Sequence, residues 1–404
     1  MKTQQKKIVP SKKQLEFLSW EFGLFFHFGI RSFYPFSRDW DMKTMELSAF
    51  DPPLIDCDEW LKTAKDAGAK YAIFTAKHHD GFANWPSAYT DYSVENVPWL
   101  DGKGDVVKLF TDACRKYDIK VGIYYSPADY RIKNGTLSGR EFEDNFIAQI
   151  SELLTNYGTI DYLWFDGCGS EGLTFDRARI INTIRSLQPD ILIFNMWDPD
   201  VRWIGNELGY APKFNSNIVN SVNFSVMTSE KELLDSKMFL PAECDMRMRD
   251  TYWFTSDDSE LDTVKSVDKL MDVYENSVGH GANMLLNIGP AATGRLPEAD
   301  KTRLLEFAQA VKERFSEPVG MSESRLTVEF ETTKISTVVI EEDLTEGETI
   351  YGFDIYADDN LVYSGKTVGH KAICCFDATP CKKIKVALTE VVGEAKICRV
   401  SAFR

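Results

Sequence analysis

Between Trp20 and Phe315 the chain alternates short apolar runs with longer amphipathic stretches. The apolar runs are nearly continuous, which is typical of parallel strands buried on both faces, and the longer stretches have the period of a helix. Such alternation predicts an α/β fold with a parallel sheet. The expected strands are residues 22–29, 71–76, 121–126, 162–166, 191–195, 238–242 and 284–288, with an eighth within 202–226.

Helix boundaries are clearest after the first expected strand. Asp56 stands three residues before Glu59, a spacing typical of a helix start, and Gly68 is placed to end that helix. Amphipathic stretches at 105–117 and 142–157 predict two more helices. Because no Gly-rich phosphate loop follows the first strand, a (β/α)8-like barrel fits better than an open doubly wound sheet, which stays the alternative.

After Phe315 the pattern changes to short segments rich in β-branched and aromatic residues, separated by turns. About six or seven such strands, at roughly 10-residue spacing, predict a β-sandwich. Pro318 and Gly320 lie in the linker expected at a domain boundary. We therefore expect two domains, a (β/α)8-like TIM barrel at residues 1–317 and a C-terminal β-sandwich at residues 318–404.

Composition and charge narrow the class of protein. Of the 404 residues 44% are hydrophobic, which is ordinary for a globular protein with a large core. Lys and Arg number 46 against 62 Asp and Glu, and the resulting net charge of −16 repels polyanions. We expect neither nucleic acid nor a membrane as a partner.

Targeting and cysteine usage point to the cell interior. The longest apolar run, residues 22–30, is too short to span a bilayer, and the first twenty residues lack the apolar core of an export signal. The eight cysteines have no paired metal-site spacing and are too sparse for a disulfide scaffold. Reduced thiols and a cytoplasmic location are the expectation.

Polar residues gather where the expected strands end. The first strand ends in His27, the second in His78 and His79, and the fourth in Asp166, so three of the five histidines belong to this set. Active sites of (β/α)8 barrels are built at the carboxyl ends of the strands. We expect these side chains to meet in one site.

Asp166 follows a run of apolar residues and precedes Gly167, so its carboxylate would emerge from an apolar wall. Two carboxylates that flank a glycosidic bond, one of them a nucleophile and the other an acid/base, are the chemistry such a site can support. The second carboxylate could be Glu171, Glu207 or Glu243, and spacing along the chain does not choose among them.

The nature of the ligand is argued from the neighbouring side chains. His27, His78, His79 and Asp80 are residue types that ligate zinc or iron, although no His-x-x-x-His or Cys-x-x-Cys pair accompanies them. Aromatic residues near the same strand ends favour a neutral sugar, because a pyranose packs its C–H face on an aromatic ring. They are Trp40, Trp85, Tyr125, Trp164, Trp197 and Trp253.

Several motifs in order resemble the α-L-fucosidases of glycoside hydrolase family 29. They are Phe26-His27-Phe28-Gly29, residues 76–82 (AKHHDGF), 102–107 (GKGDVV), 122–127 (GIYYSP), Trp164-Phe165-Asp166-Gly167 and 283–290 (NMLLNIGP). The resemblance implies a retaining glycosidase that needs no metal or other cofactor, built as a catalytic barrel followed by a β-sandwich.

The resemblance also implies roles for single residues. Asp166 would be the nucleophile, and Glu207, in the segment 201–207 (VRWIGNE), the acid/base of the branch selective for α-1,3 and α-1,4 fucosides. Glu243 is the second candidate for the acid/base. The sugar would be bound by His27, Asp39, Trp40, His78, His79, Tyr125, Trp164 and Trp253.

Three departures from the family pattern affect specificity more than the reaction. Asp39 stands before Trp40, where the family usually has Glu. Cys168-Gly169-Ser170 replaces the usual Ala-Asn-Gly, and residues 246–253 lack the usual Pro-Gly-Trp.

The working hypothesis is an exo-acting, retaining α-L-fucosidase that releases terminal fucose from fucosylated oligosaccharides or glycoconjugates by double displacement. The alternatives are another exo-glycosidase such as an α-galactosidase, a fucosidase of broad or α-1,2/1,6 linkage preference, a metal-dependent hydrolase, and a sugar-binding protein without catalysis.

Overall fold

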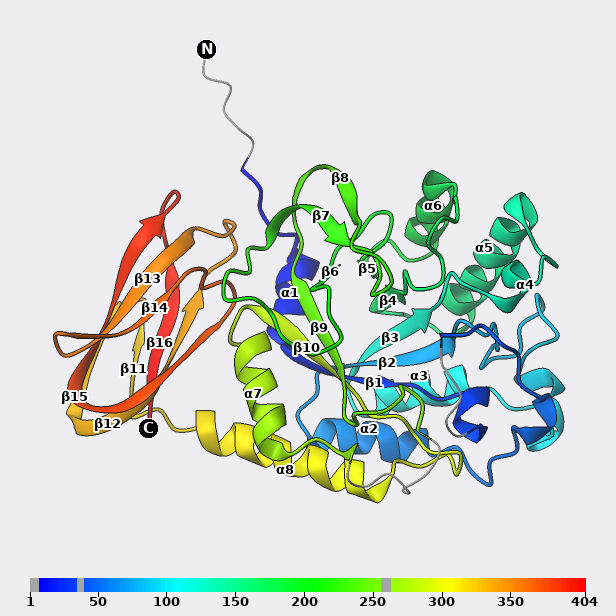
Figure 1. Cartoon of the computed structure of the whole chain (residues 1–404), viewed down its shortest axis with the longest axis horizontal. Helices are drawn as coiled ribbons and strands as arrows, with labels where there is room; N and C mark the ends of the chain where they lie inside the picture. Colours follow the sequence, from blue (N-terminus) through cyan, green and yellow to red (C-terminus); the bar gives the residue numbers. More distant parts are fainter. Residues whose placement is uncertain (1–6, 35–39, 256–262) are drawn as a thin grey trace, which may run out of the picture.

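The computed structural model describes residues 7–34, 40–255 and 263–404. Within these ranges eight parallel strands form one sheet, and they are β1 (Phe22–Phe26), β2 (Tyr71–Lys77), β3 (Lys120–Tyr125), β4 (Tyr162–Phe165), β5 (Leu192–Phe194), β6 (Arg202–Trp203), β9 (Ala242–Arg247) and β10 (Ala282–Asn287). The strand order is β5-β4-β3-β2-β1-β10-β9-β6 (Figure 1). A parallel bridge between Phe194 of β5 and Val201, the residue before β6, joins the two edges of the sheet. The predicted barrel is confirmed and the open sheet is wrong.

Helices surround this barrel, and the first of them packs on its amino-terminal end. They are α1 (Lys12–Trp20), α2 (Cys57–Asp66), α3 (Val106–Lys116), α4 (Tyr130–Lys133), α5 (Gly139–Asn156), α6 (Arg177–Leu187), α7 (Val267–Ser277) and α8 (Glu298–Phe315), with short 3₁₀ helices η1 (Ile30–Phe33), η2 (Leu47–Ala49), η3 (Val94–Asn96) and η4 (Trp99–Gly102). The expected start of α2 is confirmed, because the Asp56 carboxylate accepts a hydrogen bond from the Glu59 amide at 3.0 Å.

The barrel strands are buried on both faces. Phe25 points into the barrel, where it packs with aromatic residues of β3 and β4, and its neighbours Leu24 and Phe26 point outward against the helices. Phe17 and Trp20 of α1 join the interior cluster. The amino-terminal end of the barrel is therefore filled with side chains, and space for a ligand is left at the carboxyl end.

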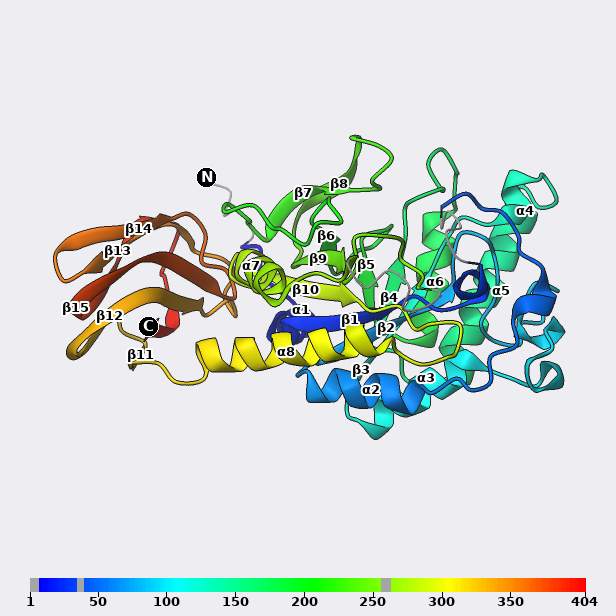
Figure 2. The ribbon, with the colours of Figure 1, turned by 60° about the horizontal axis from the view of Figure 1, so that its bottom comes forward.

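The region between β6 and β9 differs from the expected pattern. The eighth strand is the two-residue β6, and an antiparallel hairpin of β7 (Ile218–Asn223) and β8 (Lys231–Phe239) follows it. The expected strand at 238–242 is wrong in its position, because Pro241 separates the end of β8 from β9 within one apolar run. Figure 2 shows the hairpin standing out from the barrel.

The C-terminal domain is the predicted β-sandwich. Its strands β11 (Gly320–Glu323), β12 (Thr327–Glu342), β13 (Ile350–Ala357), β14 (Asn360–Gly365), β15 (Ala372–Val391) and β16 (Ile397–Phe403) pair antiparallel in the order β11-β16-β12-β15-β13-β14. Bulges interrupt the pairing of β12 with β15, which allows these long strands to bend. The domain has its own core, which includes Val338, Ile355 and Ile384. The predicted boundary at 317/318 lies between α8 and β11.

The sandwich lies beside the α7 side of the barrel in both views (Figures 1 and 2). Glu21, just before β1, accepts hydrogen bonds from His370 at 3.1 Å and from Lys371 at 2.5 Å. A backbone bridge between His280 and Ala372 adds to this contact.

Across the described ranges no helix is both long and apolar enough to cross a membrane.

Candidate active site

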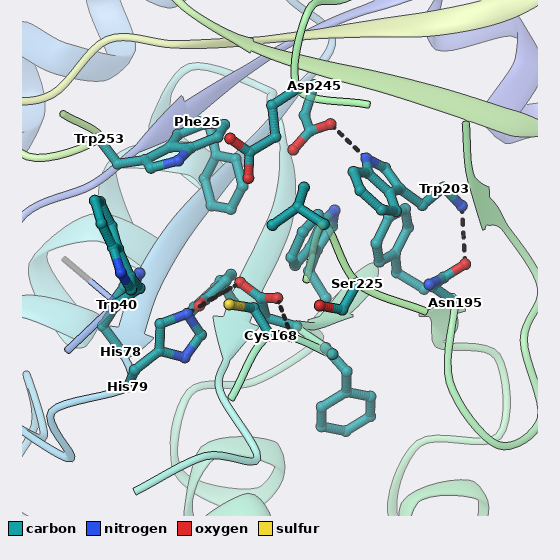
Figure 3. A pocket seen from close by; sticks show the side chains of 18 of the residues that line it. Phe25, Trp40, His78, His79, Cys168, Asn195, Trp203, Ser225, Asp245 and Trp253 are labelled. Atoms are coloured by element: carbon teal, nitrogen blue, oxygen red, sulfur yellow. Dashed lines mark hydrogen bonds and ion pairs between the residues drawn. The ribbon is translucent and has the colours of Figure 1, made fainter. Parts of the chain in front are cut away.

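A pocket opens at the carboxyl ends of the barrel strands, as the sequence predicted (Figure 3). Its walls come from β1, β3, β4, β5, β6 and β9, from the segments after β2 and β6, and from the tip of the β7–β8 hairpin. The residues that line it are Phe25, His27, Trp40, His78, His79, Tyr124, Trp164, Phe165, Asp166, Gly167, Cys168, Phe194, Asn195, Trp203, Glu207, Phe224, Ser225, Val226, Met227, Asp245, Arg247 and Trp253.

Asp166 directly follows β4 and is held from three sides. Its Oδ2 accepts a hydrogen bond from the Tyr124 hydroxyl at 2.9 Å, and its Oδ1 accepts one from the Cys168 amide at 2.8 Å. The His79 Nε2 atom lies 3.5 Å from Oδ2. Burial raises the pKa of Asp166 to about 6, against the lowering effect of these hydrogen bonds. The carboxylate is fixed in direction and ionised at neutral pH.

The three predicted histidines lie together in the pocket. His27 Nδ1 is 2.8 Å from the Asn287 carboxamide oxygen, an acceptor, so Nδ1 carries the proton and Nε2 is left as an acceptor. Burial lowers the pKa of His27 to about 3 and that of His78 well below its usual value. His79 Nδ1 lies 2.6 Å from the Ser126 hydroxyl. Neutral imidazoles of this kind suit uncharged hydroxyl ligands.

Aromatic rings form two sides of the pocket. Trp40 is 47% exposed at the mouth, where Figure 3 shows it on the opposite side from Trp203. Trp253 lies over the His27 ring with a centroid distance of 4.9 Å. Trp164 is deeper and stacks on Phe194 at 4.1 Å. Asp39, the residue before Trp40, lies outside the described residues, so its predicted contact with a sugar stays a prediction.

Tyr125 does not line the pocket, which corrects its predicted place beside the nucleophile. Its side chain packs outside the barrel against Phe146, and its hydroxyl donates to Gln149 at 2.7 Å. Tyr124 faces the barrel interior and provides the contact to Asp166. Successive side chains of a strand point to opposite faces, so only one of two neighbouring tyrosines can face the site.

Glu207 lines the pocket on a loop that follows β6. The loop turns at Gly205, whose φ of 101° favours glycine. The Asn206 carboxamide oxygen then accepts a hydrogen bond from the Leu208 amide at 3.0 Å. Leu208 pairs with Met246 of β9 in an antiparallel bridge. The loop is therefore attached to the barrel wall, with Glu207 held at the pocket.

The other two candidate carboxylates are not among the pocket residues. Glu243 is fully buried inside the barrel, where it accepts hydrogen bonds from Tyr71 at 2.6 Å, Tyr162 at 3.2 Å and Trp164 at 2.8 Å. Burial raises the pKa of Glu243 to about 7. Glu171 is bound by the Ser225 hydroxyl. Glu243 thus fixes Trp164 from the interior of the barrel, and the Glu243 carboxyl has no access to a ligand in the pocket.

Asp245, Arg247 and Asn195 line the pocket and were not expected from the sequence. Asp245 stands two residues after Glu243 on β9, so strand alternation places both side chains on one face and could have revealed it. Asn195 accepts a hydrogen bond from the Trp203 amide at 3.0 Å and donates to the Asn223 carbonyl at 2.6 Å (Figure 3). It thereby ties the hairpin to the pocket wall.

Of the four metal-site candidates, the three histidines share the pocket and Asp80 lies apart from them. Asp80 does not line the pocket, because it pairs with Arg31 at 2.8 Å and caps the Phe82 amide at 2.9 Å. In the part of the chain that the structure describes, no three His, Cys, Asp or Glu side chains form a group that could hold a metal ion.

Comparison with known proteins gives one consistent family. A model of the alpha-L-fucosidase family matches residues 2–314. Alpha-L-fucosidase 1 of Arabidopsis thaliana is 35% identical over 318 residues, which are 76% of this chain and 61% of the plant protein. This chain thus spans less than two thirds of that relative's length.

Solved structures with the same architecture agree with this match. A glycoside hydrolase 29 family member from an unknown rumen bacterium is 30% identical, with a TM-score of 0.87 over 98% of this chain and 77% of that chain. A Ruminococcus gnavus glycoside hydrolase 29 fucosidase, solved in complex with fucose, is 25% identical, with a TM-score of 0.84 over 98% of this chain and 95% of that chain.

Proposed function

Because the chain belongs to the alpha-L-fucosidase family, we propose that it hydrolyses terminal α-L-fucosides with retention of configuration. The observation that carries the proposal is the setting of Asp166. This carboxylate is oriented by Tyr124, by the Cys168 amide and by His79, and it shares its pocket with Glu207. A fixed carboxylate with a second carboxyl in one pocket is what double displacement requires.

In the first step the Asp166 carboxylate attacks the anomeric carbon of fucose. The bond from that carbon to the leaving oxygen breaks, and Glu207 gives its proton to this oxygen. In the second step Glu207 takes a proton from water, and the water oxygen displaces Asp166 from the anomeric carbon. The sugar leaves with the configuration it had in the substrate, because it has been inverted twice.

The lining of the pocket supports the proposed sugar-binding residues. The neutral rings of His27 and His78 can exchange hydrogen bonds with hydroxyl groups, and His79 lines the pocket next to the nucleophile. Trp40, Trp164 and Trp253 offer apolar surfaces for the C–H groups of the pyranose. Asp39 is proposed from the family resemblance alone. The fucose bound to the Ruminococcus gnavus relative supports this substrate class.

For the leaving group, we propose that the enzyme prefers fucose attached through α-1,3 and α-1,4 linkages. It rests on the segment 201–207, which resembles the branch selective for those linkages, and on the presence of its Glu207 in the pocket. Broad or α-1,2/1,6 preference is the alternative. The cytoplasmic location expected from the sequence stays a prediction.

The proposed function is tested with a panel of substrates. Aryl α-L-fucoside and aryl α-galactoside separate a fucosidase from an α-galactosidase, and fucosylated oligosaccharides with α-1,2, α-1,3, α-1,4 and α-1,6 linkages report linkage preference. We expect turnover of the fucoside only, with the α-1,3 and α-1,4 glycans cleaved fastest. Turnover of the galactoside alone would overturn the proposal, and fastest cleavage of α-1,2 or α-1,6 glycans would overturn the linkage preference.

A further inference from the structure

A third carboxyl group lines the pocket, and double displacement gives it no role. Asp245 lies near the end of β9 and is only 4% exposed. Its Oδ1 accepts a hydrogen bond from the Trp203 indole N–H at 2.6 Å, drawn in Figure 3. A buried carboxyl is costly unless it is hydrogen-bonded or shares a charge with a neighbour. The role of Asp245 in the pocket therefore depends on which charged group lies next to its carboxyl.

Backbone pairing places Glu207 and Asp245 on one face of the pocket wall. The bridge between Leu208 and Met246 is antiparallel, so Glu207 stands opposite Arg247 and Gly209 opposite Asp245. Glu207 is therefore the diagonal neighbour of Asp245 on the face that their side chains share. The loop is also close to the strand, because a Cβ atom on Gly209 would lie 3.3 Å from the Cβ of Met246. The two carboxyl groups therefore line one wall of the pocket.

The other charged and titratable groups around Asp245 can be named. Arg247, on the same strand, stands opposite Glu207 in the backbone pairing. Its guanidinium lies 5.6 Å from the Trp253 ring centroid and donates to the Thr251 carbonyl. Glu243 lies deeper in the barrel and is bound by two tyrosines and a tryptophan. Asp166 and the three histidines stand at the ends of β1, β2 and β4.

Charge interaction within the pair is unfavourable when both groups are ionised. Burial raises the pKa of Asp245 well above its usual value, and the charge of Glu207 raises it further. Two adjacent carboxyl groups in a pocket of low polarity lose their protons in two separate steps that belong to the pair.

We propose that Asp245 is a positioning residue that holds one proton jointly with Glu207. This inference rests on the proposed function and adds to it. In the first step the shared proton passes to the leaving oxygen as its bond to the anomeric carbon breaks. Both carboxyl groups are then ionised, and their repulsion makes Glu207 a stronger base toward the incoming water, whose proton restores the pair.

The test compares the pH profiles of kcat/KM for Asp245→Asn and the wild type. Asn removes the charge while keeping an oxygen that can accept from Trp203. We expect the alkaline limb to move to lower pH by about one unit or more, because Glu207 alone releases its proton more easily. Trp203→Phe removes the hydrogen bond to the Asp245 carboxylate, so the limb moves to higher pH. Asp235→Asn, on the exposed face of β8, removes one charge away from the pocket and leaves the limb unchanged.

Opposite shifts in the two variants support the shared proton, because damage to packing would not move the limb in opposite directions. If Asp245→Asn does not fold, the direction of the Trp203→Phe shift decides. An alkaline limb that stays in place in every folded variant overturns the inference. A wild type without fucosidase activity would instead contradict the proposed function. In that case ¹³C NMR titration of the Glu207 carboxyl tests the shared proton without an activity assay. The titration midpoint must be lower in Asp245→Asn than in the wild type for the inference to stand.

Discussion

At the scale of single residues, the setting of Asp166 has a consequence for pH dependence. Burial raises the pKa of this nucleophile to about 6, so the attacking carboxylate form predominates only above that pH. We predict that kcat/KM for an aryl α-L-fucoside falls about tenfold per pH unit below pH 6, since each unit removes nine tenths of the ionised form. Initial rates between pH 4 and pH 9 measure this. A rate that stays level down to pH 4 would contradict the raised pKa.

Glu207 acts on the leaving group, so its removal should depend on the substrate. Glu207→Gln should lose about 10²–10⁴-fold in kcat on fucosylated oligosaccharides, whose leaving oxygen needs a proton. The loss should be smaller on activated aryl fucosides. Glu171→Gln, outside the pocket, serves as the control and should show no such dependence on the leaving group. Equal losses of Glu207→Gln on both substrates would remove it from the acid role.

At the scale of one element, β3 offers a matched pair of neighbouring tyrosines. Tyr124→Phe removes the hydrogen bond to Asp166 and should lower kcat/KM by about 10-fold, in line with about 1–1.5 kcal/mol for one hydrogen bond. Tyr125→Phe breaks only the bond to Gln149, so it should reduce stability by about 1 kcal/mol and leave the rate near that of the wild type. Steady-state kinetics and thermal unfolding of both variants check this. The reverse pattern would show that the faces of β3 are assigned wrongly.

The same strand explains one limit of prediction from the sequence. Residues 121–126 are apolar or aromatic at nearly every position, because a barrel strand is buried on both faces. The pattern therefore marks the strand without telling which tyrosine faces inward. Asp245 was missed for a related reason, since the apolar run across Pro241 shifted the expected strand away from β9. Side-chain direction is fixed by contacts between strands, which the pattern does not contain.

At the scale of the whole molecule, the contact of Glu21 with the sandwich links stability to pH. Burial acts to raise the pKa of Glu21, but the hydrogen bond from His370 and the charge of Lys371 outweigh it and lower the pKa to about 2. A lowered pKa stabilises the fold above the ordinary value near 4.5, and this contribution is lost as the pH falls toward 2.

Glu21→Gln should therefore lower the free energy of unfolding at pH 7 by about 1–2 kcal/mol, after allowance for screening by solvent. The difference between variant and wild type should shrink as the pH falls from 5 to 3. Thermal unfolding at several pH values measures it, with Glu346→Gln as a control at an exposed ion pair. A difference that is constant over this range would mean that Glu21 contributes through packing instead of charge.

The sequence pattern predicted the two domains better than it predicted how the barrel sheet closes. Repeated buried strands and capped helices indicated the barrel, and the change of period after Phe315 indicated the sandwich. The bridge between Phe194 and Val201 joins two segments through backbone atoms, which leave no trace in residue types. The meeting of His27, His78, His79 and Asp166 was predictable because parallel strands end at one edge.

Covalent trapping identifies the nucleophile of the proposed reaction. A 2-fluoro α-L-fucosyl derivative with an activated leaving group reacts in the first step and then hydrolyses slowly, so mass spectrometry of a proteolytic digest can locate the sugar. We predict one fucosyl adduct, on the peptide that contains Asp166 and at its carboxylate. An adduct on any other residue would contradict this prediction.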